Sequence, residues 1–203
     1  GLVFLTLGVS IMLELHAWRI TGISPLLQNN PATTMMMSAD TGLSVGRKRY
    51  DDKNEAEIRT YKNAAGNYVH PTAGFRSGFL VAASGRKIAR KSAKAILAGS
   101  VFPTEVEAIL LDEKGKPITK YELHKSRVMV GKAGVLRVRP MYWPWACLLA
   151  VDVDRDFIGD LSVITEILNI AGRIIGIGDY RPDTSKGKSG VGTFGRYEAS
   201  LVK

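Results

Sequence analysis

Hydrophobic and polar residues alternate in the segment LELHAWRI, residues 13–20. A period of two places Leu15 on one face of an extended chain and Trp18 on the other. Gly22 and Pro25 then interrupt the pattern, because glycine and proline favour turns. We therefore predict a strand over residues 13–20.

Later segments also have the apolar pattern of strands. They are residues 105–112, 119–130, 135–140, 146–154 and 173–178, followed by a last strand near the C-terminal end. In the third of these, Leu136 and Val138 would point inward. The two arginines of that strand, Arg137 and Arg139, would point outward. The fourth, ACLLAVDVD, is apolar almost throughout, so we expect both of its faces to be buried or nearly so.

Three segments have the charge or spacing of helices. Residues 50–62 are rich in charged side chains, and a short hairpin is predicted next, over residues 60–69. A second helix is predicted to begin at Pro71 and Thr72, which are residue types that start helices, and to stop at Gly85. A third follows residues 146–154, where aspartates favour a helix start and apolar residues recur at helical spacing.

This order of elements predicts an α+β fold in which helices pack on one face of an antiparallel sheet. Two stretches, about residues 28–49 and 181–193, lack a pattern and are predicted to be long loops. The apolar start of the chain is shorter than the ~20 residues of a membrane span. We expect residues 1–11 to be an extension before a natural start at Met12, and residues 12–203 to form a single domain.

Composition adds a strong positive charge to this picture. The 203 residues carry a formal net charge of +9, and 45% of them are hydrophobic, which suits a folded domain with a core. Between Arg47 and Arg139 there are 20 Lys and Arg against nine Asp and Glu. A polyanion is therefore a plausible partner. The single cysteine, Cys147, excludes an intramolecular disulfide and is expected to be a buried thiol.

Basic side chains are candidates for phosphate contacts. They are Arg76, Arg86, Lys87, Arg90, Lys91, Arg127, Arg137, Arg139, Arg181, Lys186, Lys188 and Arg196. If residues 86–94 form a helix, Lys87, Arg90, Lys91 and Lys94 share one face. Phe75, Tyr142 and Trp143 would stack on unpaired bases, at ~1–3 kcal/mol per base. In the alternative interpretation, the cations only face solvent and the aromatic rings belong to the core.

A glycine-rich segment near the C-terminal end is the second candidate feature. It contains Gly176, Gly178, Gly190, Gly192 and Gly195. Glycine lets backbone N–H groups approach a phosphate closely, so the segment is a candidate cradle for a nucleic-acid backbone. It lacks the GxxxxGK[ST] pattern of a nucleotide-binding P-loop. The alternative is an ordinary surface loop.

Three histidines, His16, His70 and His124, are the weak catalytic candidates. One of them would serve as general base in a metal-independent ribonuclease. No paired histidine spacing typical of a metal site is present, so no metal or cofactor is expected. The group Asp152, Asp154 and Asp156 is more simply a strand end leading into a helix.

Four segments resemble the RAMP superfamily, the RNA-binding proteins that form the backbone of CRISPR effector complexes. They are AGRIIGIGDYRP…GTFGRYEASL, VHPTAGFRSGFLVAAS with Arg76 at the basic position, WRITGISPLL, and ITKYELHKSRVMV…LRVRPMYWPW. The same order of motifs is similar to a group of uncharacterised phage and prophage proteins over roughly residues 16–198. The resemblance to the phage group is the more specific of the two.

This resemblance implies a ferredoxin-like, RRM-type antiparallel sheet with helices on one face and a helix-loop insertion. It further implies single-stranded RNA or DNA held along the sheet and the glycine-rich loop. A homo-oligomer or filament along the ligand and a place in the cytoplasm of a bacterial host, away from membranes, are also implied. The leading hypothesis is a nucleic-acid-binding module without enzymatic activity. The alternatives are a metal-independent endoribonuclease and a phage structural or interaction protein.

Overall fold

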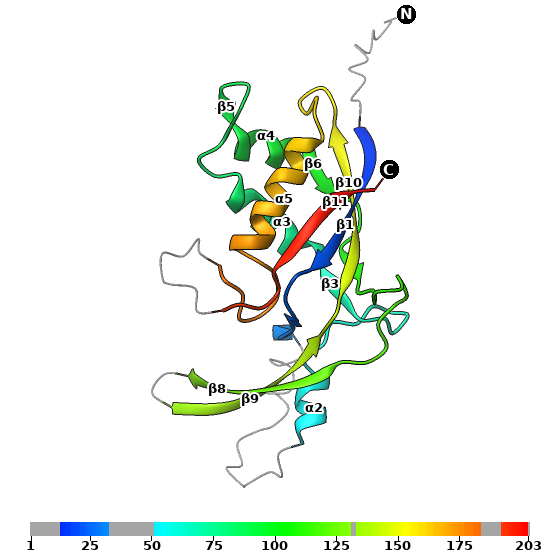
Figure 1. The fold of residues 1–203 in the computed structure, drawn as a ribbon, viewed down its shortest axis with the longest axis vertical. Helices are drawn as coiled ribbons and strands as arrows, with labels where there is room; N and C mark the ends of the chain where they lie inside the picture. The colour runs from blue at the N-terminus through cyan, green and yellow to red at the C-terminus, as the bar shows by residue number, and fades with distance from the viewer. Residues whose placement is uncertain (1–12, 33–50, 131–132, 184–191, 203) are drawn as a thin grey trace, which may run out of the picture.

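The computed structural model describes residues 13–32, 51–130, 133–183 and 192–202. These residues form an α+β fold with antiparallel sheets, as predicted (Figure 1). The strands are β1 (Leu13–Gly22), β2 (Leu26–Leu27), β3 (Val69–Pro71), β4 (Lys87–Ile88), β5 (Lys91–Ser92), β6 (Val101–Pro103), β7 (Glu107–Ile109), β8 (Glu122–Val130), β9 (Ala133–Tyr142), β10 (Ala146–Asp154) and β11 (Tyr197–Leu201). The helices are α2 (Asp52–Glu57), α3 (Thr72–Ala82), α4 (Ala93–Ser100) and α5 (Ser162–Ile174).

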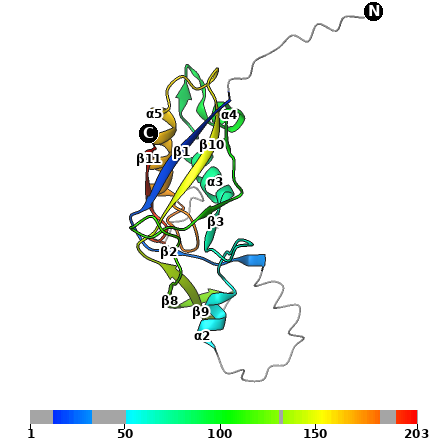
Figure 2. The same cartoon turned by 90° about the vertical axis from the view of Figure 1, so that its right-hand side faces the viewer.

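The main sheet has four strands in the order β11-β1-β10-β6, and every neighbouring pair is antiparallel. In chain order, its strands and the two larger helices follow one another as β1, α3, β6, β10, α5 and β11. Helices α3 and α5 lie together on one face of the sheet, while β1 and β10 are in front in the perpendicular view (Figure 2). Alternating residues explain this layering, because Trp18 and Ile20 of β1 and Leu149 of β10 are buried beneath the helices.

Helix α5 packs closely against the last strand, β11. A Cβ atom at Gly172 would lie 2.1 Å from the carbonyl oxygen of Tyr197, so only glycine allows this approach. One turn earlier, the Asn169 side-chain amide donates to the Ala199 carbonyl and accepts from the Ala199 N–H, both at 2.9 Å. The apolar face of α5 thus covers the edge of the sheet with its backbone groups satisfied.

A second part of the molecule is built on a long hairpin. Strands β8 and β9 pair from Glu122 opposite Met141 to Val130 opposite Ala133, and β2 pairs with β9. Helix α2 packs against this hairpin, at the end of the molecule opposite the β4–β5 hairpin (Figure 1). Asp51 caps α2 by accepting from the N–H groups of Lys53 and Asn54.

Several local predictions were wrong. The helix considered for residues 86–94 does not form, because these residues make the β4–β5 hairpin and the first residues of α4, with Ala89 and Arg90 at positive φ in the turn. No strand forms at 173–178, because α5 continues to Ile174 and Gly176 then turns the chain. Strand β10 is buried on one face only, since Leu148 is 50% exposed.

The directions expected for two side chains of β9 were also wrong. Leu136 is 45% exposed, whereas Arg139 is only 3% exposed. Strands β8 and β9 belong to a separate three-stranded sheet with β2, and Arg139 is buried because it pairs with Asp179 of the glycine-rich loop, as described below. Among the described residues, no helix combines the length and the apolar character needed to cross a bilayer.

Candidate nucleic-acid interface

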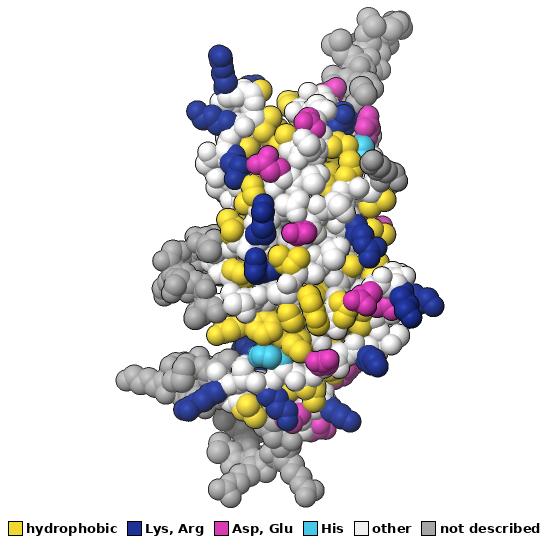
Figure 3. All heavy atoms as spheres, in the orientation of Figure 1, with side chains coloured by type: hydrophobic (Ala, Val, Ile, Leu, Met, Phe, Trp, Pro, Cys, Tyr) yellow, Lys and Arg dark blue, Asp and Glu magenta, His cyan; other side chains and the backbone are white. Residues whose placement is uncertain are grey.

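The predicted phosphate-binding side chains do not gather in one groove. Arg86, Lys87, Arg90 and Lys91 lie on the β4–β5 hairpin at one end, and Arg127 and Arg137 lie on the β8–β9 hairpin at the other (Figure 1). Basic side chains are spread along the whole length of the face shown in Figure 3, with acidic side chains between them. Of the candidates, Lys186, Lys188 and Gly190 lie outside the described residues.

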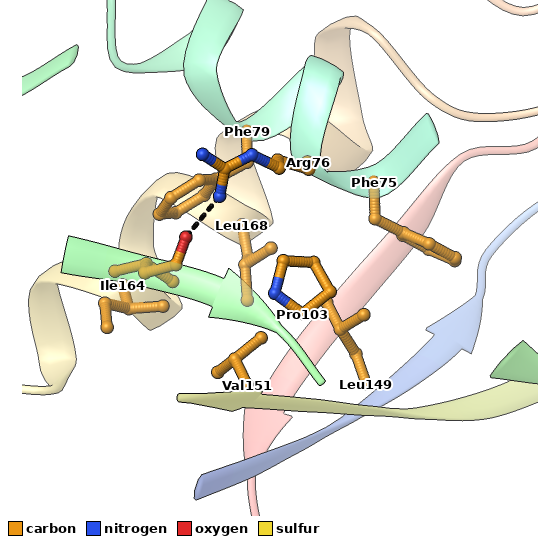
Figure 4. Close-up of a pocket in the computed structure, with 9 residues that line it drawn as sticks. Phe75, Arg76, Phe79, Pro103, Leu149, Val151, Ile164 and Leu168 are labelled. Atoms are coloured by element: carbon orange, nitrogen blue, oxygen red, sulfur yellow. Dashed lines mark hydrogen bonds between the residues drawn. The ribbon is translucent and has the colours of Figure 1, made fainter. Parts of the chain in front are cut away.

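Arg76 is held by the protein itself. Its Nη2 atom donates to the carbonyl oxygen of Ala98 at 2.8 Å, and Nη1 donates to the carbonyl oxygen of Val101. The guanidinium also lies 4.9 Å from the centroid of the Phe102 ring. In Figure 4 it borders a small apolar pocket of about 20 Å³ between α3 and β6. The side chain therefore satisfies the last carbonyls of α4, which have no partner within the helix.

Arg139 also has an internal role. Its Nε atom donates to Oδ2 of Asp179 at 2.7 Å, and Nη1 donates to the hydroxyl of Ser126 at 2.8 Å. Because the arginine side chain is buried, its charge depends on the carboxylate of Asp179 for compensation. The ion pair joins β9 to the glycine-rich loop rather than offering a free cation to a ligand.

The three aromatic candidates differ in their exposure. Phe75 is fully buried and Tyr142 is 1% exposed, so both rings belong to the core and neither offers a face to a base in this structure. Trp143 is 49% exposed and follows Tyr142 at the end of β9, where the bond to Pro144 is cis. Trp143 is thus the only one of the three available for stacking.

The glycines of the C-terminal loop face protein backbone. A Cβ atom at Gly178 would lie 2.4 Å from the Leu27 carbonyl oxygen, and one at Gly195 would lie 1.8 Å from the Ile177 carbonyl oxygen. Gly176, Gly178 and Gly195 also have positive φ angles. Hydrogen bonds from Asp179 N–H to Leu27 and from Gly195 N–H to Pro25 fasten the loop to β2 and the segment before it. The glycines therefore permit close packing of the loop on the chain.

This packing creates a pocket of about 370 Å³ beside the start of α3. Gly178, Asp179 and Arg181 of the glycine-rich loop line one side of it. Tyr61, His70, Pro71 and Gly74 line the other, together with Asn29 and Pro31. The first turn of α3 has no side-chain cap, although the Thr72 N–H donates to the Val106 carbonyl oxygen at 3.0 Å. Pro71 and Gly74 line the pocket, so the positive end of the helix dipole lies beside it.

Two nitrogen atoms at this pocket have no hydrogen-bond partner. Nδ1 of His70 and Nε of Arg181 are both buried and unpaired. His70 is 5% exposed, and burial together with the charge of Arg181 lowers the pKa of its imidazole to about 4. The ring is therefore neutral at pH 7 and carries a single N–H donor. Arg181 also donates to the carboxylate of Asp183 at 3.0 Å and is 36% exposed.

The acidic groups at the pocket are engaged with arginines. Asp179 pairs with Arg139, as described above, and Asp183 pairs with Arg181. Burial and the charge of Asp179 raise the pKa of the Tyr61 hydroxyl, so this group remains a neutral donor. The pocket combines a helix N-terminus, a guanidinium, the Tyr61 hydroxyl and a neutral imidazole, which is an arrangement suited to an oxyanion.

The remaining histidines lie elsewhere. His16 on β1 contacts Oε2 of Glu14 at 3.1 Å. His124 on β8 packs edge-on against Phe194, and burial together with the charge of Arg139 lowers its pKa. The three histidines thus belong to three different strands with different neighbours. Within the described parts of the chain, no group of three His, Cys, Asp or Glu is placed to hold a metal ion.

Sequence reasoning missed Tyr61 and Asp179 as members of this pocket. Asp179 stands in the GDYRP motif between two residues that were candidates, Gly178 and Arg181, so the motif itself carried a signal. No sequence pattern pointed to Tyr61, because it lies in an irregular segment more than a hundred residues away from the glycine-rich loop.

No protein-family model matches the sequence, and a comparison with curated proteins found no match.

Proposed function

We propose that this protein binds single-stranded nucleic acid, with a backbone phosphate in the pocket between the glycine-rich loop and α3. The supporting observation is that the partly exposed side chain of Arg181 lines this pocket beside the first turn of α3, together with the neutral hydroxyl of Tyr61. A phosphate oxygen would accept a charge-assisted hydrogen bond from the guanidinium, and the helix N-terminus favours its negative charge.

We further propose that the four-stranded sheet is of the ferredoxin-like type. The strand order β11-β1-β10-β6 and the chain order strand-helix-strand-strand-helix-strand support this assignment. The same features support the proposed relationship to the RAMP superfamily, with the β8–β9 hairpin and α2 as the insertion. On this proposal the protein acts in the cytoplasm of a bacterial host.

The two basic hairpins would supply sequence-independent affinity. Five cations, Arg86, Lys87, Arg90, Lys91 and Lys94, are exposed around β4 and β5. Arg127 is exposed on β8, and Trp143 offers a ring for stacking at the far end of β9. A strand that runs along the molecule would contact both ends and the pocket between them, and its affinity would fall with salt.

The test is fluorescence anisotropy with labelled dT and rU oligonucleotides over a series of salt concentrations. We expect binding at ~50 mM salt, where the electrostatic contribution is large. Lys87→Glu with Lys91→Glu should lower the salt slope by about two, and Arg181→Ala should weaken binding to all sequences alike. The matched control is Lys114→Glu with Lys116→Glu, two exposed lysines in the turn after β7.

The outcomes separate the proposed phosphate site from general charge attraction. No binding at low salt overturns the proposal. If the Lys114/Lys116 control variant loses as much affinity as the Lys87/Lys91 variant, net charge alone attracts the oligonucleotide. That result also contradicts the proposal. Sedimentation of the protein with and without oligonucleotide then tests whether copies assemble along the strand. The oligonucleotide should remain intact in a chelator, because the three histidines do not converge.

A further inference from the structure

The face of the main sheet opposite α3 and α5 carries large apolar side chains in contact with solvent. Leu15 is 67% exposed, Leu148 is 50% exposed and Phe102 is 42% exposed. Leu15 and Phe102 are the partners of Asp152 on the two neighbouring strands, so they stand in one row across the sheet. None of the described helices packs on this face, which is turned to the viewer in Figure 2.

The apolar face continues into a groove of about 440 Å³ beside β7. Leu148 and Ala150 of β10 form its floor, and Val106 and Ile109 form its wall. Val106 is 81% exposed, which is unusual for a branched apolar residue held between two ordered strands. Exposed contiguous apolar surface of this kind marks sites of association with another macromolecule.

Carboxylates lie in the groove and on the open face of the sheet beside it, although the chain as a whole is strongly basic. Glu105 and Glu107 line the groove and are exposed. Asp152 and Asp154 lie on β10 opposite Leu15 and Leu13, and Glu198 lies on β11 opposite Thr21. Arg19, paired with Leu148, is the one basic residue among the outward-facing positions of β1, β10, β11 and β6. At the β6 edge, the guanidinium of Arg76 also lies 4.9 Å from the centroid of the Phe102 ring. These charges repel phosphates and attract cationic side chains.

We propose that this surface, formed by the open faces of β1, β6 and β10 and the groove beside β7, docks a protein segment. The segment presents apolar side chains to the groove and lysine or arginine side chains to the surrounding carboxylates. Charge complementarity selects this occupant, because a nucleic acid would place its phosphates against five carboxylates. The groove shares no lining residue with the phosphate pocket, but the two adjoin at the start of α3, where Thr72 lines the groove and Pro71 lines the pocket.

The probe is the fluorescein-labelled peptide Ac-KLKLKLK-NH2, compared with its acidic counterpart Ac-ELELELE-NH2. We expect the basic peptide to bind the full-length protein and to weaken as salt rises, and the acidic peptide to remain free. Glu105→Lys with Glu107→Lys, and separately Leu148→Lys, should each weaken the basic peptide at least tenfold. All three positions are exposed, and circular dichroism will verify that each variant is folded.

Matched controls place equivalent changes elsewhere on the surface. Glu113→Lys with Glu122→Lys reverses two exposed carboxylates away from the groove, and Ile174→Lys changes an exposed apolar residue on α5. Neither control should alter peptide binding by more than twofold. If the controls weaken binding as much as the groove variants, the peptide recognises overall charge and the proposal fails.

Hydrogen exchange identifies the surface directly. The basic peptide should protect residues 104–109 and 146–152 from exchange, and a labelled oligonucleotide should leave them unprotected. Protection of these segments by the oligonucleotide instead would make this a nucleic-acid surface. A dimer in sedimentation that Leu148→Lys converts to a monomer would make the occupant a second copy. Either result overturns this proposal while leaving the phosphate pocket at α3 to its own test.

Discussion

The Nε atom of Arg139 lies 2.7 Å from the Oδ2 atom of Asp179, across 40 positions of sequence. This pair connects β9 of the long hairpin to the glycine-rich loop that follows α5. Asp179 is itself fixed by its own N–H, which donates to the Leu27 carbonyl oxygen at 2.8 Å. The ion pair therefore holds together the hairpin, the loop and β2, which are the elements around the proposed phosphate pocket.

Removing the carboxylate of Asp179 should destabilise the fold. Asp179→Asn leaves the Arg139 guanidinium buried with weaker compensation, and an unsatisfied charged group costs ~1–3 kcal/mol or more. The partial exposure of Asp179 reduces this cost through solvent screening. Urea unfolding of Asp179→Asn, of Arg139→Met and of the double variant measures the coupling free energy between the two side chains. A coupling of zero would show that the pair contributes nothing to stability.

Replacing Gly195 by alanine should destabilise the fold more than the same change at an open glycine position. Gly195 has a φ angle of +66°, and an added Cβ would lie 1.8 Å from the Ile177 carbonyl oxygen. Gly85 is the matched control, because it has a φ angle of +78° with nothing within 4 Å. Gly85→Ala should cost ~1–2 kcal/mol for the left-handed backbone alone. Gly195→Ala should cost a further ~1–3 kcal/mol from overpacking. Equal unfolding free energies would contradict the close approach.

Acid should destabilise the protein through His70. Burial lowers the pKa of this imidazole to about 4 in the folded state, whereas an unfolded histidine has a pKa near 6.5. Below pH 6.5 the unfolded chain therefore binds a proton that the folded chain does not. Stability is complete above pH 6.5 and falls between pH 6.5 and pH 4, by up to ~3 kcal/mol.

The His70→Gln variant separates this contribution from other titrating groups. Its unfolding free energy should decline less steeply than that of the wild type between pH 7 and pH 4, whatever its starting value. Urea unfolding at half-unit pH steps gives both curves. Parallel curves would show that His70 titrates normally in the folded protein.

The thiol of Cys147 should be inert in the folded protein. Burial raises its pKa to about 12, and the side chain is fully buried in β10. The thiolate is the reactive form, so both its low population and its inaccessibility protect it at pH 8. An aromatic disulfide reagent should label the folded protein only at the rate of unfolding, and should label one thiol per chain in urea. Rapid labelling without denaturant would contradict the placement of β10.

The elements with strong periodic patterns could be predicted from the sequence. Strand β1 lies where alternation predicted it, strand β10 lies at the predicted apolar run, and α3 begins at the predicted helix-start residue Thr72. The β4–β5 hairpin could not be predicted, because its turn residues Ala89 and Arg90 adopt positive φ without the glycine or asparagine that usually indicates such a turn.

The candidate site was only partly predictable for a related reason. The burial of Arg139 depends on Asp179, and the exposure of Leu136 depends on how far the hairpin extends from the main sheet. Both are consequences of tertiary contacts that no local pattern encodes. The sequence did identify Arg181 and Gly178, because the glycine-rich motif places them next to each other in one loop.

If the protein binds single-stranded nucleic acid as proposed, the positions of the two basic hairpins at opposite ends of the molecule would determine the minimum length of an effective oligonucleotide. A short oligonucleotide reaches one hairpin only, so its affinity should reflect a fraction of the cations. As the oligonucleotide is lengthened one nucleotide at a time, binding should strengthen abruptly at the length that bridges both ends. That threshold is the footprint of one protein molecule, and it would set the spacing of successive copies on a longer strand.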